Sequence, residues 1–374
     1  MSDYQFLNAY TFANGATVKN RIVMPPMTER SAFENGVVSN DEIEYYRKRA
    51  GGVGMEITGC ANVSKLGKGF EGELSVTEDR DIPQLSRLAA AMKSQSAKAI
   101  LQIFDAGRMT NTAILRGEQP VSASAVKATR ANSETPRKLS EHEVEKIIKD
   151  FGAATKRAIQ AGFDGVEIHG ANTYLIQQFF SPDSNRRRDQ WGGSLEQRMN
   201  FPVAVAEEVR RVADQYAPRT FIVGYRISPE EIETPGIRLD DTLTLIPRLI
   251  KSGIDYLHVS LNKAWQTSLN DSTDSQPIIE KIQKVVDHQV PMIVVGQLTK
   301  PADVEKVMDA GFEFAAMGQE LIREPNWVQK VMANDEKSIR YELSPSDLDE
   351  LGITEPLWDF LKGPFKDAIH ITNE

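Results

Sequence analysis

Residues 162–200 read GFDGVEIHGANTYLIQQFFSPDSNRRRDQWGGSLEQRMN, and this stretch holds the pattern from which the rest of the chain can be interpreted. It begins with a short apolar run between glycines, residues 165–168, which is typical of a buried strand. His169, Asn172 and Tyr174 follow at once. Because His169 and Asn172 are three residues apart, a helical turn after the strand would place both side chains on one side.

These three side chains match the needs of one kind of reaction. Two hydrogen-bond donors that hold a carbonyl oxygen, and a phenol that gives up a proton, are what reduction of a polarised double bond requires. Taken alone, the triplet favours a structural role, because a histidine after a strand more often caps or packs than catalyses. The other strand ends change that balance.

The composition excludes several classes of protein. The chain has 374 residues, of which 40% are hydrophobic and 26% charged, enough for a sizeable core without the bias of a disordered chain. A net charge of −9 argues against binding to nucleic acid or to an anionic membrane surface. Cys60 is the single cysteine, which excludes an intrachain disulfide and a cysteine-ligated metal cluster. The five histidines lack a metal-ligand spacing, and without a signal peptide or membrane span a cytoplasmic protein is expected.

Strand and helix patterns alternate along the whole chain. An Asn14-Gly15 pair between short apolar pieces indicates a β-hairpin near the N-terminus. The expected strands are residues 21–25, 53–58, 98–104, 165–168, 221–227, 256–260, 291–295 and 314–317. The expected helices are residues 41–50, 81–97, 140–161, 194–217, 240–252, 277–287 and 301–310, with a last helix from about 324.

Four of the helix-to-strand junctions share a sequence pattern, in which a glycine ends the helix before a short turn. They are at residues 51–54, 161–164, 252–255 and 310–313. Eight alternating units predict one domain over residues 1–374, with a closed (β/α)8 TIM barrel at about 20–335. An open doubly wound sheet is the weaker alternative, because no Gly-x-Gly-x-x-Gly follows the first strand. The C-terminal extension, residues 343–374, is expected to pack on the barrel or on a second subunit of a homo-oligomer.

The carboxyl ends of the strands of such a barrel share one site, so the residues there are the candidate functional residues. They are Pro25, Pro26, Met27, Thr28, Gly59, Cys60, Gln102, His169, Asn172, Tyr174, Arg226, Ser260, Gly296, Gln297, Gly318 and Gln319. The glycine turns at Gly296 and Gly318 favour a phosphate site made by backbone amides. Gln102 and Arg226 suit a flat heterocycle with imide-like edges that carries negative charge when reduced. That describes flavin mononucleotide (FMN), although these residues alone would equally allow another phosphorylated ligand.

At this point the chain resembles a known family, the old yellow enzymes, which are FMN-dependent ene-reductases. The resemblance covers nearly the whole chain to about residue 335. The matching segments are residues 20–24, 26–28, 101–102, 106–108, 162–164, 169–175, 181–182, 184–185 and 189–198.

The resemblance implies a role for each matching residue. Pro26, Met27 and Thr28 would line the flavin, Gln102 would contact its pyrimidine edge, and Arg226 would lie beside the ring end that gains charge. The remaining predicted cofactor residues come from the strand-end positions themselves, and they are Gly59, Gly296, Gly318 and Gln319.

The implied reaction passes hydride from NADH or NADPH through FMN to an activated alkene. His169 and Asn172 would bind the carbonyl or nitro oxygen of this small-molecule substrate. Tyr174 would give a proton to the carbon next to that group. Phe104 stands where the family often has a large aromatic residue over the substrate.

One position departs from the family pattern. Gln319 follows Gly318 where the family usually has an arginine on the phosphate, and Arg323 is the candidate replacement. Two alternative functions therefore stay open. One is a flavin reductase or NADH oxidase that passes electrons to oxygen or a quinone. The other is a barrel that has lost flavin binding and serves as a ligand-binding protein.

Overall fold

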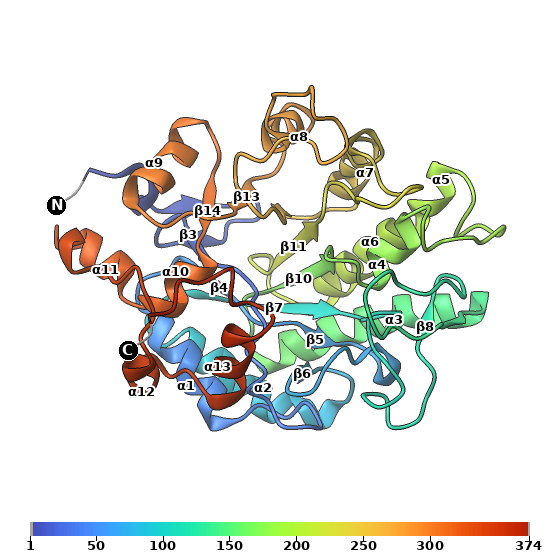
Figure 1. The fold of residues 1–374 in the computed structure, drawn as a ribbon, viewed down its shortest axis with the longest axis horizontal. Helices are drawn as coiled ribbons and strands as arrows, with labels where there is room; N and C mark the ends of the chain where they lie inside the picture. The colour runs from blue at the N-terminus through green and yellow to red at the C-terminus, as the bar shows by residue number, and fades with distance from the viewer. Residues whose placement is uncertain (1–2, 373–374) are drawn as a thin grey trace.

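Eight parallel strands close into a barrel in the computed structural model, which describes residues 3–372 (Figure 1). Neighbouring strands follow the order of the chain, and β14 pairs with β3 to close the ring. The barrel strands are β3 (Ile22–Met24), β4 (Met55–Ile57), β7 (Lys98–Phe104), β10 (Gly165–Gly170), β11 (Ile222–Ile227), β12 (Tyr256–Val259), β13 (Met292–Val295) and β14 (Phe314–Ala316). The predicted TIM barrel is thus confirmed.

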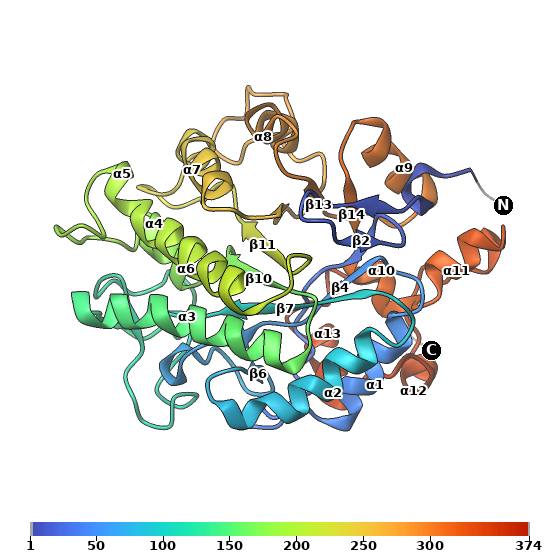
Figure 2. The ribbon, with the colours of Figure 1, turned by 180° about the vertical axis from the view of Figure 1, so that it is seen from behind.

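Helices surround this ring and bury their apolar faces against it (Figures 1 and 2). The main ones are α1 (Asn40–Arg49), α2 (Ile82–Met92), α3 (Glu141–Ala161), α6 (Asn200–Tyr216), α7 (Leu239–Lys251), α8 (Ile278–Val286), α9 (Pro301–Asp309), α10 (Gly318–Arg323) and α11 (Trp327–Met332). Ser140 begins α3 with the predicted capping box to Glu143. At three of the predicted junctions the glycine, Gly162, Gly253 or Gly311, has a positive φ of 83–88°. Such a backbone favours glycine and ends the helix.

Shorter elements fill the connections between the barrel units. The short helices are α4 (Leu175–Phe180), α5 (Leu195–Arg198), α12 (Leu348–Leu351) and α13 (Glu355–Lys362), with 3-10 turns at Gln5–Leu7, Lys65–Gly67, Asp79–Asp81, Glu336–Ser338 and Pro345–Asp347. The short strands are β5 (Ala61–Asn62), β6 (Leu74–Ser75), β8 (Val121–Ser122) and β9 (Arg137–Lys138). β5 and β6 extend the barrel sheet, so the segment after β4 is anchored at the mouth of the barrel.

Several predicted boundaries were wrong. The helix expected over residues 194–217 is interrupted at Met199, between α5 and α6. The helix expected over 81–97 ends at Met92, before a turn in which Ser96 has a positive φ of 68°. The last helix, expected from about 324, begins at Trp327 as α11, and the short α10 before it was not predicted. In the first two cases a turn interrupts a stretch that was predicted as one helix.

The predicted N-terminal hairpin closes the amino-terminal end of the barrel. Its strands, β1 (Tyr10–Thr11) and β2 (Thr17–Val18), are antiparallel, and Asn14 caps the entry to β11 by donating to the carbonyl of Phe221. Phe12 stacks on Phe314 with ring centroids 5.4 Å apart. The opposite, carboxyl end of the strands is therefore the end that is left for a site.

The C-terminal segment packs on the barrel, as one of its two predicted placements stated. Leu357, Leu361 and Ile369 are buried, and Leu343 forms a β-bridge with Ile371. The hairpin lies on the face seen in Figure 2, whereas α13 lies on the face seen in Figure 1. Residues 373–374 of the predicted extension, and residues 1–2, lie outside the described residues.

Candidate active site

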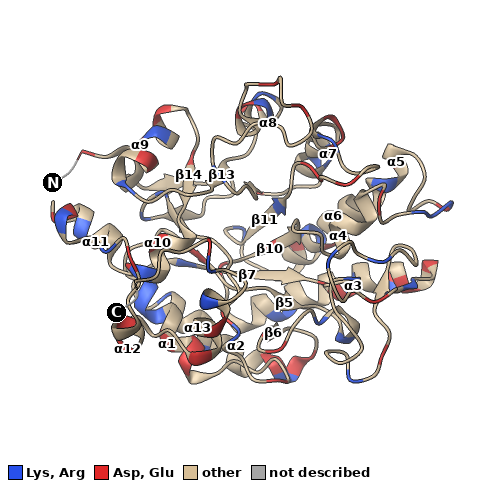
Figure 3. Cartoon of the chain, in the orientation of Figure 1, with Lys and Arg blue, Asp and Glu red and all other residues tan. Residues whose placement is uncertain are grey.

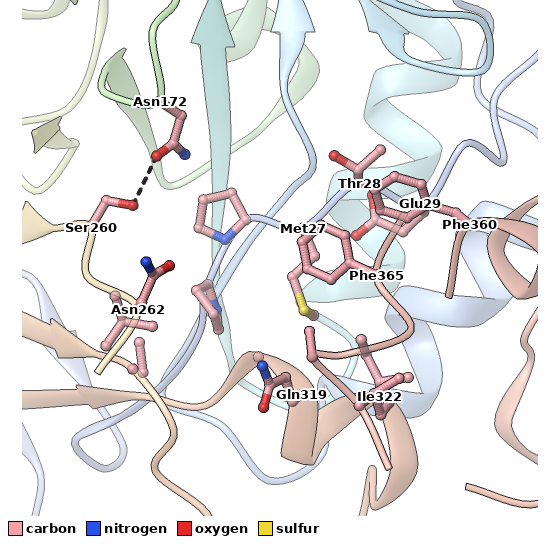
Figure 4. A pocket seen from close by; sticks show the side chains of 18 of the residues that line it. Met27, Thr28, Glu29, Asn172, Ser260, Asn262, Gln319, Ile322, Phe360 and Phe365 are labelled. Atoms are coloured by element: carbon pink, nitrogen blue, oxygen red, sulfur yellow. Dashed lines mark hydrogen bonds between the residues drawn. The ribbon is translucent and has the colours of Figure 1, made fainter. Parts of the chain in front are cut away.

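A cavity of about 720 Å³ lies at the carboxyl end of the barrel, a size typical of sites for small molecules and cofactors. Most of the predicted site residues line it together, contributed by the carboxyl ends of all eight barrel strands. They are Pro25, Pro26, Met27, Thr28, Cys60, Gln102, His169, Asn172, Tyr174, Arg226, Ser260, Gly296, Gln297, Gly318 and Gln319. Figure 4 shows part of this lining.

Two of the predicted site residues lie outside the cavity lining. Gly59 lies beside a smaller hollow, and its backbone N–H donates to the hydroxyl of Tyr46 over 2.6 Å. Phe104 is fully buried behind the wall, with its ring edge-on to Tyr174 at 4.9 Å between centroids. Phe104 therefore supports Tyr174 from behind.

The backbone around the central triplet differs from the expected helical turn. β10 extends to Gly170, so His169 belongs to the strand itself. Asn172 and Thr173 have positive φ values of 56° and 65°, and α4 starts only at Leu175. The prediction of a turn of helix was wrong: His169 reaches the cavity from the strand, and the tight loop places Asn172 in the same cavity.

His169 is held as a neutral donor. The backbone N–H of Ala171 donates to its Nδ1 over 3.3 Å, which leaves the ring proton on Nε2. Burial, with Arg226 and His258 nearby, holds the pKa of His169 well below its usual range. The side chain is only 3% exposed. His169 can therefore offer an N–H to a ligand without a charge.

Asn172 is oriented by two serine hydroxyls. Its Oδ1 accepts from Ser260 over 3.1 Å and from Ser228 over 3.4 Å (Figure 4). Its own backbone N–H donates to the hydroxyl of Ser228 over 2.9 Å. With the oxygen engaged, the Nδ2 amide group is left to donate into the cavity.

Tyr174 completes this wall of the cavity. Its ring is edge-on to His169, with centroids 5.0 Å apart. Burial is the main cause that raises the pKa of Tyr174 above its usual value, with Cys60 and Glu73 adding to the effect. The phenol is therefore protonated throughout the neutral range, and it can act as an acid.

The floor of the cavity holds a guanidinium group without an acceptor. Arg226 is 9% exposed, and its Nε is buried without a hydrogen-bond partner among residues 3–372. Burial lowers the pKa of Arg226, and the carboxylate of Glu167 offsets only part of this shift, so the net shift is downward. A buried donor group of this kind calls for an anionic or carbonyl-bearing ligand. Beside it, Gln102 donates its amide nitrogen to Glu167 over 2.7 Å.

Two glycines leave room on the far side of the cavity. Gly296 has a φ of +132°, and a Cβ there would come within 2.6 Å of the backbone nitrogen of Ala264. At Gly318 a Cβ would lie 3.0 Å from Sδ of Met27. The absence of a side chain thus lets these two turns pack closely on Ala264 and Met27, while both glycines line the cavity.

This tail end of the cavity is not basic. Arg323 does not line it, because its guanidinium group is bound to Glu320 with an Nε–Oε2 distance of 2.8 Å. Arg323 therefore does not take the place of an arginine at position 319 in this arrangement. Asn262, Gln297 and Gln319 line this part of the cavity instead. Its hydrogen-bonding groups are carboxamides.

Sequence reasoning missed several lining residues. Glu29 and Tyr45 come from β3–α1, and Phe360 and Phe365 come from the C-terminal segment, which covers one side of the cavity. In Figure 4 the rings of Phe360 and Phe365 lie close to Met27, Thr28 and Glu29. Glu29 directly follows the predicted Thr28, which was an available signal. No periodic pattern could have placed Phe365 there.

No helix among residues 3–372 is long and apolar enough to cross a membrane. The same residues contain no cluster of three or more His, Cys, Asp or Glu that could hold a metal ion. Figure 3 shows acidic and basic residues interspersed over the outer helices and loops. The electrostatic character of the cavity therefore comes from its few buried charges.

A closed parallel barrel with converging polar residues at the carboxyl ends of its strands defines an enzyme of the barrel class. Comparison with known proteins defines the family. Residues 10–338 match the model of the NADH:flavin oxidoreductase / NADH oxidase family. The chain belongs to this family, and it is an oxidoreductase whose cofactors are FMN and NADH or NADPH.

Relatives agree with this assignment. The chain is 44% identical over 362 residues to an NADH:fumarate oxidoreductase of Klebsiella pneumoniae (strain 342), covering 96% of this chain and 39% of that protein. It is 41% identical over 363 residues to YqiG of Bacillus subtilis (strain 168), named as a probable NADH-dependent flavin oxidoreductase, covering 96% of this chain and 97% of that protein. The chain spans about two fifths of the length of the first of these relatives.

A solved structure shows the same architecture. Morphinone reductase in complex with tetrahydroNAD superposes with a TM-score of 0.79 at 25% identity, over 94% of this chain and 96% of that chain. The family model thus confirms the flavin oxidoreductase family that the sequence motifs indicated, and the solved structure shows the same fold.

The residues present fit an FMN molecule at its ring end. The unpartnered guanidinium of Arg226 matches an acceptor atom of the flavin pyrimidine ring, and the free oxygen of the Gln102 amide matches the imide N–H of the same ring. Apolar side chains of Pro25, Pro26 and Met27 line the adjoining wall. The tail end offers a phosphate the neutral carboxamides of Asn262, Gln297 and Gln319 and the backbone of its two glycine turns, but no cation.

Proposed function

We propose that this chain reduces activated alkenes, taking electrons from NADH or NADPH through FMN. The observation that carries the proposal is the wall formed by His169, Asn172 and Tyr174 facing the same cavity as Arg226. A neutral imidazole N–H and an amide N–H can together bind one carbonyl or nitro oxygen. Tyr174 stands next to them with a protonated phenol.

In this mechanism the chain orients the substrate and moves one proton. His169 and Asn172 polarise the double bond by hydrogen bonds to the oxygen of the activating group. FMN held by Gln102 and Arg226 would supply the hydride for the far carbon of the double bond. Tyr174 gives its proton to the carbon next to the activating group, and solvent restores the proton afterwards. Arg226 stabilises the negative charge that gathers at the floor of the cavity during the reduction.

The charges of the lining favour a neutral substrate. Arg226 is the one Lys or Arg side chain among the described lining residues, and Asp367 contributes a carboxyl group. Because Arg226 lies at the floor of the cavity, no second cation is left near His169 to bind the other carboxylate of a dicarboxylate. We therefore expect enones and nitroalkenes to be reduced more efficiently than fumarate by this chain.

The test uses purified protein loaded with FMN. Under anaerobic conditions, NADPH or NADH should bleach the flavin absorbance, and 2-cyclohexenone should restore it in a stoichiometric amount. A protein that is bleached but not reoxidised by enones, nitroalkenes or maleimides would refute the alkene proposal.

A second function is favoured by the family description, which also covers NADH oxidases. In that case oxygen or a quinone would be the acceptor, and no proton from Tyr174 would be needed. The variant Tyr174→Phe distinguishes the two, since it would slow alkene reduction and leave the oxidase reaction unchanged.

A further inference from the structure

A buried carboxylate lies directly under the cavity and belongs to none of the roles described above. Glu167 is fully buried within β10, two residues before His169, and therefore on the same side of the strand. It accepts three hydrogen bonds from side chains of two other strands, β7 and β12. The donors are Nε2 of Gln102 at 2.7 Å, the hydroxyl of Tyr256 at 2.9 Å and Nδ1 of His258 at 2.9 Å.

The first of these bonds fixes the orientation of Gln102. A carboxylate can only accept, so the amide nitrogen of Gln102 must face Glu167. The carbonyl oxygen of Gln102 is then free for the cavity that this residue lines. A flipped amide would bring two oxygens together and lose the bond. Glu167 therefore determines which end of the amide a ligand meets.

The charge of Glu167 balances that of Arg226. Burial acts to raise the pKa of Glu167, but His258, Arg226 and Gln102 outweigh it, and the net shift is downward. Burial lowers the pKa of His258, so this imidazole stays neutral at physiological pH. The buried group beneath the cavity thus holds one negative and one positive charge.

We propose that Glu167 is a positioning residue of the flavin site, which fixes the Gln102 amide and offsets the charge of Arg226 so that bound flavin is held at a lower reduction potential. The proposal rests on FMN being bound over Gln102 and Arg226, as the proposed function has it. Reduced flavin is anionic, so a negative charge beneath the ring disfavours reduction, and its removal favours it.

Two substitutions separate the charge from the hydrogen bond. Glu167→Gln keeps the size and an acceptor oxygen for Gln102 but removes the charge. Glu167→Asp keeps the charge but is one methylene shorter, so it loses reach to Gln102. Tyr256→Phe is the matched control, because it removes one hydrogen bond to Glu167 and leaves both charges in place.

The readouts are the midpoint potential of the bound flavin, from equilibration with a reference dye, and the dissociation constant of FMN. Glu167→Gln should favour reduced flavin at least tenfold, an upward shift of about 30 mV for a two-electron couple, with FMN affinity within threefold. Glu167→Asp should weaken FMN binding about tenfold and change the oxidised-to-reduced ratio less than threefold. The Tyr256→Phe control should change that ratio less than twofold.

Each outcome decides a part of the inference. An unchanged potential in Glu167→Gln overturns the charge role, and native FMN affinity in Glu167→Asp overturns the positioning role. If Glu167→Gln does not fold, Glu167→Asp alone decides the positioning role. Failure of the proposed function is distinguished by a separate readout. In that case the unaltered protein would bind flavin, but an enone would not reoxidise the reduced flavin.

Discussion

Replacing Tyr174 with phenylalanine removes one oxygen atom from the cavity wall and leaves the packing intact. The aromatic ring keeps its edge-on contacts with Phe104 at 4.9 Å and with His169 at 5.0 Å between centroids. No residue in the described range 3–372 hydrogen-bonds to the phenol oxygen, so the variant orphans no buried partner. We therefore expect its free energy of unfolding to change by less than ~0.5 kcal/mol.

The expected effect on the reaction is large and confined to one half of it. A positioned acid accelerates a reaction roughly 10²- to 10⁴-fold, which corresponds to about 3–5.5 kcal/mol of the activation free energy of alkene reduction. Reoxidation of the flavin by 2-cyclohexenone should slow by that factor in Tyr174→Phe. Reduction of the flavin by NADPH needs no proton from this residue, and its rate should stay within about twofold, far below the effect of a lost acid.

Anaerobic stopped-flow measurement of the flavin absorbance separates the two halves. Tyr45→Phe is the matched control, because Tyr45 lines the same cavity and also has a buried hydroxyl, yet lies away from His169 and Asn172 on α1. The control should retain both rates. An equal loss in both halves of the reaction, or unchanged reoxidation in Tyr174→Phe, would refute the role of the phenol.

Three further perturbations test other parts of the site. Ser260→Ala removes the 3.1 Å hydrogen bond to Oδ1 of Asn172. Losing about 0.5–1.5 kcal/mol of substrate binding should raise KM for enones roughly two- to tenfold in steady-state kinetics. An unchanged KM would contradict the role of Ser260 in orienting Asn172. Gln319→Arg places a cation at the neutral tail end of the cavity and should strengthen binding of FMN by about 1.5–3 kcal/mol relative to riboflavin, which lacks the phosphate. Flavin fluorescence titration measures both affinities. An unchanged ratio of the FMN affinity to the riboflavin affinity would mean that the phosphate lies elsewhere. Burial raises the pKa of Glu29 from 4.5 to about 8, so the folded state binds a proton that the unfolded state has lost, and stability falls as pH rises between those values, by up to ~5 kcal/mol. Glu29→Gln cannot ionise, so its Tm relative to the unaltered protein should rise from pH 5 to pH 9, and a constant difference would refute the shift.

The barrel could be predicted because its signals are local and repeated. β7 has the boundaries that its apolar run KAILQIF indicated, and Gly162, Gly253 and Gly311 end their helices where the sequence placed them. Once eight units are recognised, closure brings the strand ends together. That is why residues as distant as Met27 and Arg226 could be assigned to one cavity.

The remaining features depend on contacts between distant segments. The positive φ of Asn172 and Thr173 is set by their loop, which Ser228 and Ser260 hold from two other strands. The place of Phe365 over the cavity follows from packing of the C-terminal segment, which carries no period. The pairing of Arg323 with Glu320 also needed coordinates, because sequence spacing alone equally allowed Arg323 to face the cavity.

The most direct test of the central claim is an anaerobic titration of the FMN-loaded protein, followed by its absorbance spectrum. The account predicts that one equivalent of NADPH or NADH bleaches the flavin band and that one equivalent of 2-cyclohexenone restores it, with cyclohexanone as the product. A flavin band that bleaches and then returns only when oxygen or a quinone is admitted would contradict alkene reduction. A protein that binds no FMN would contradict the site itself.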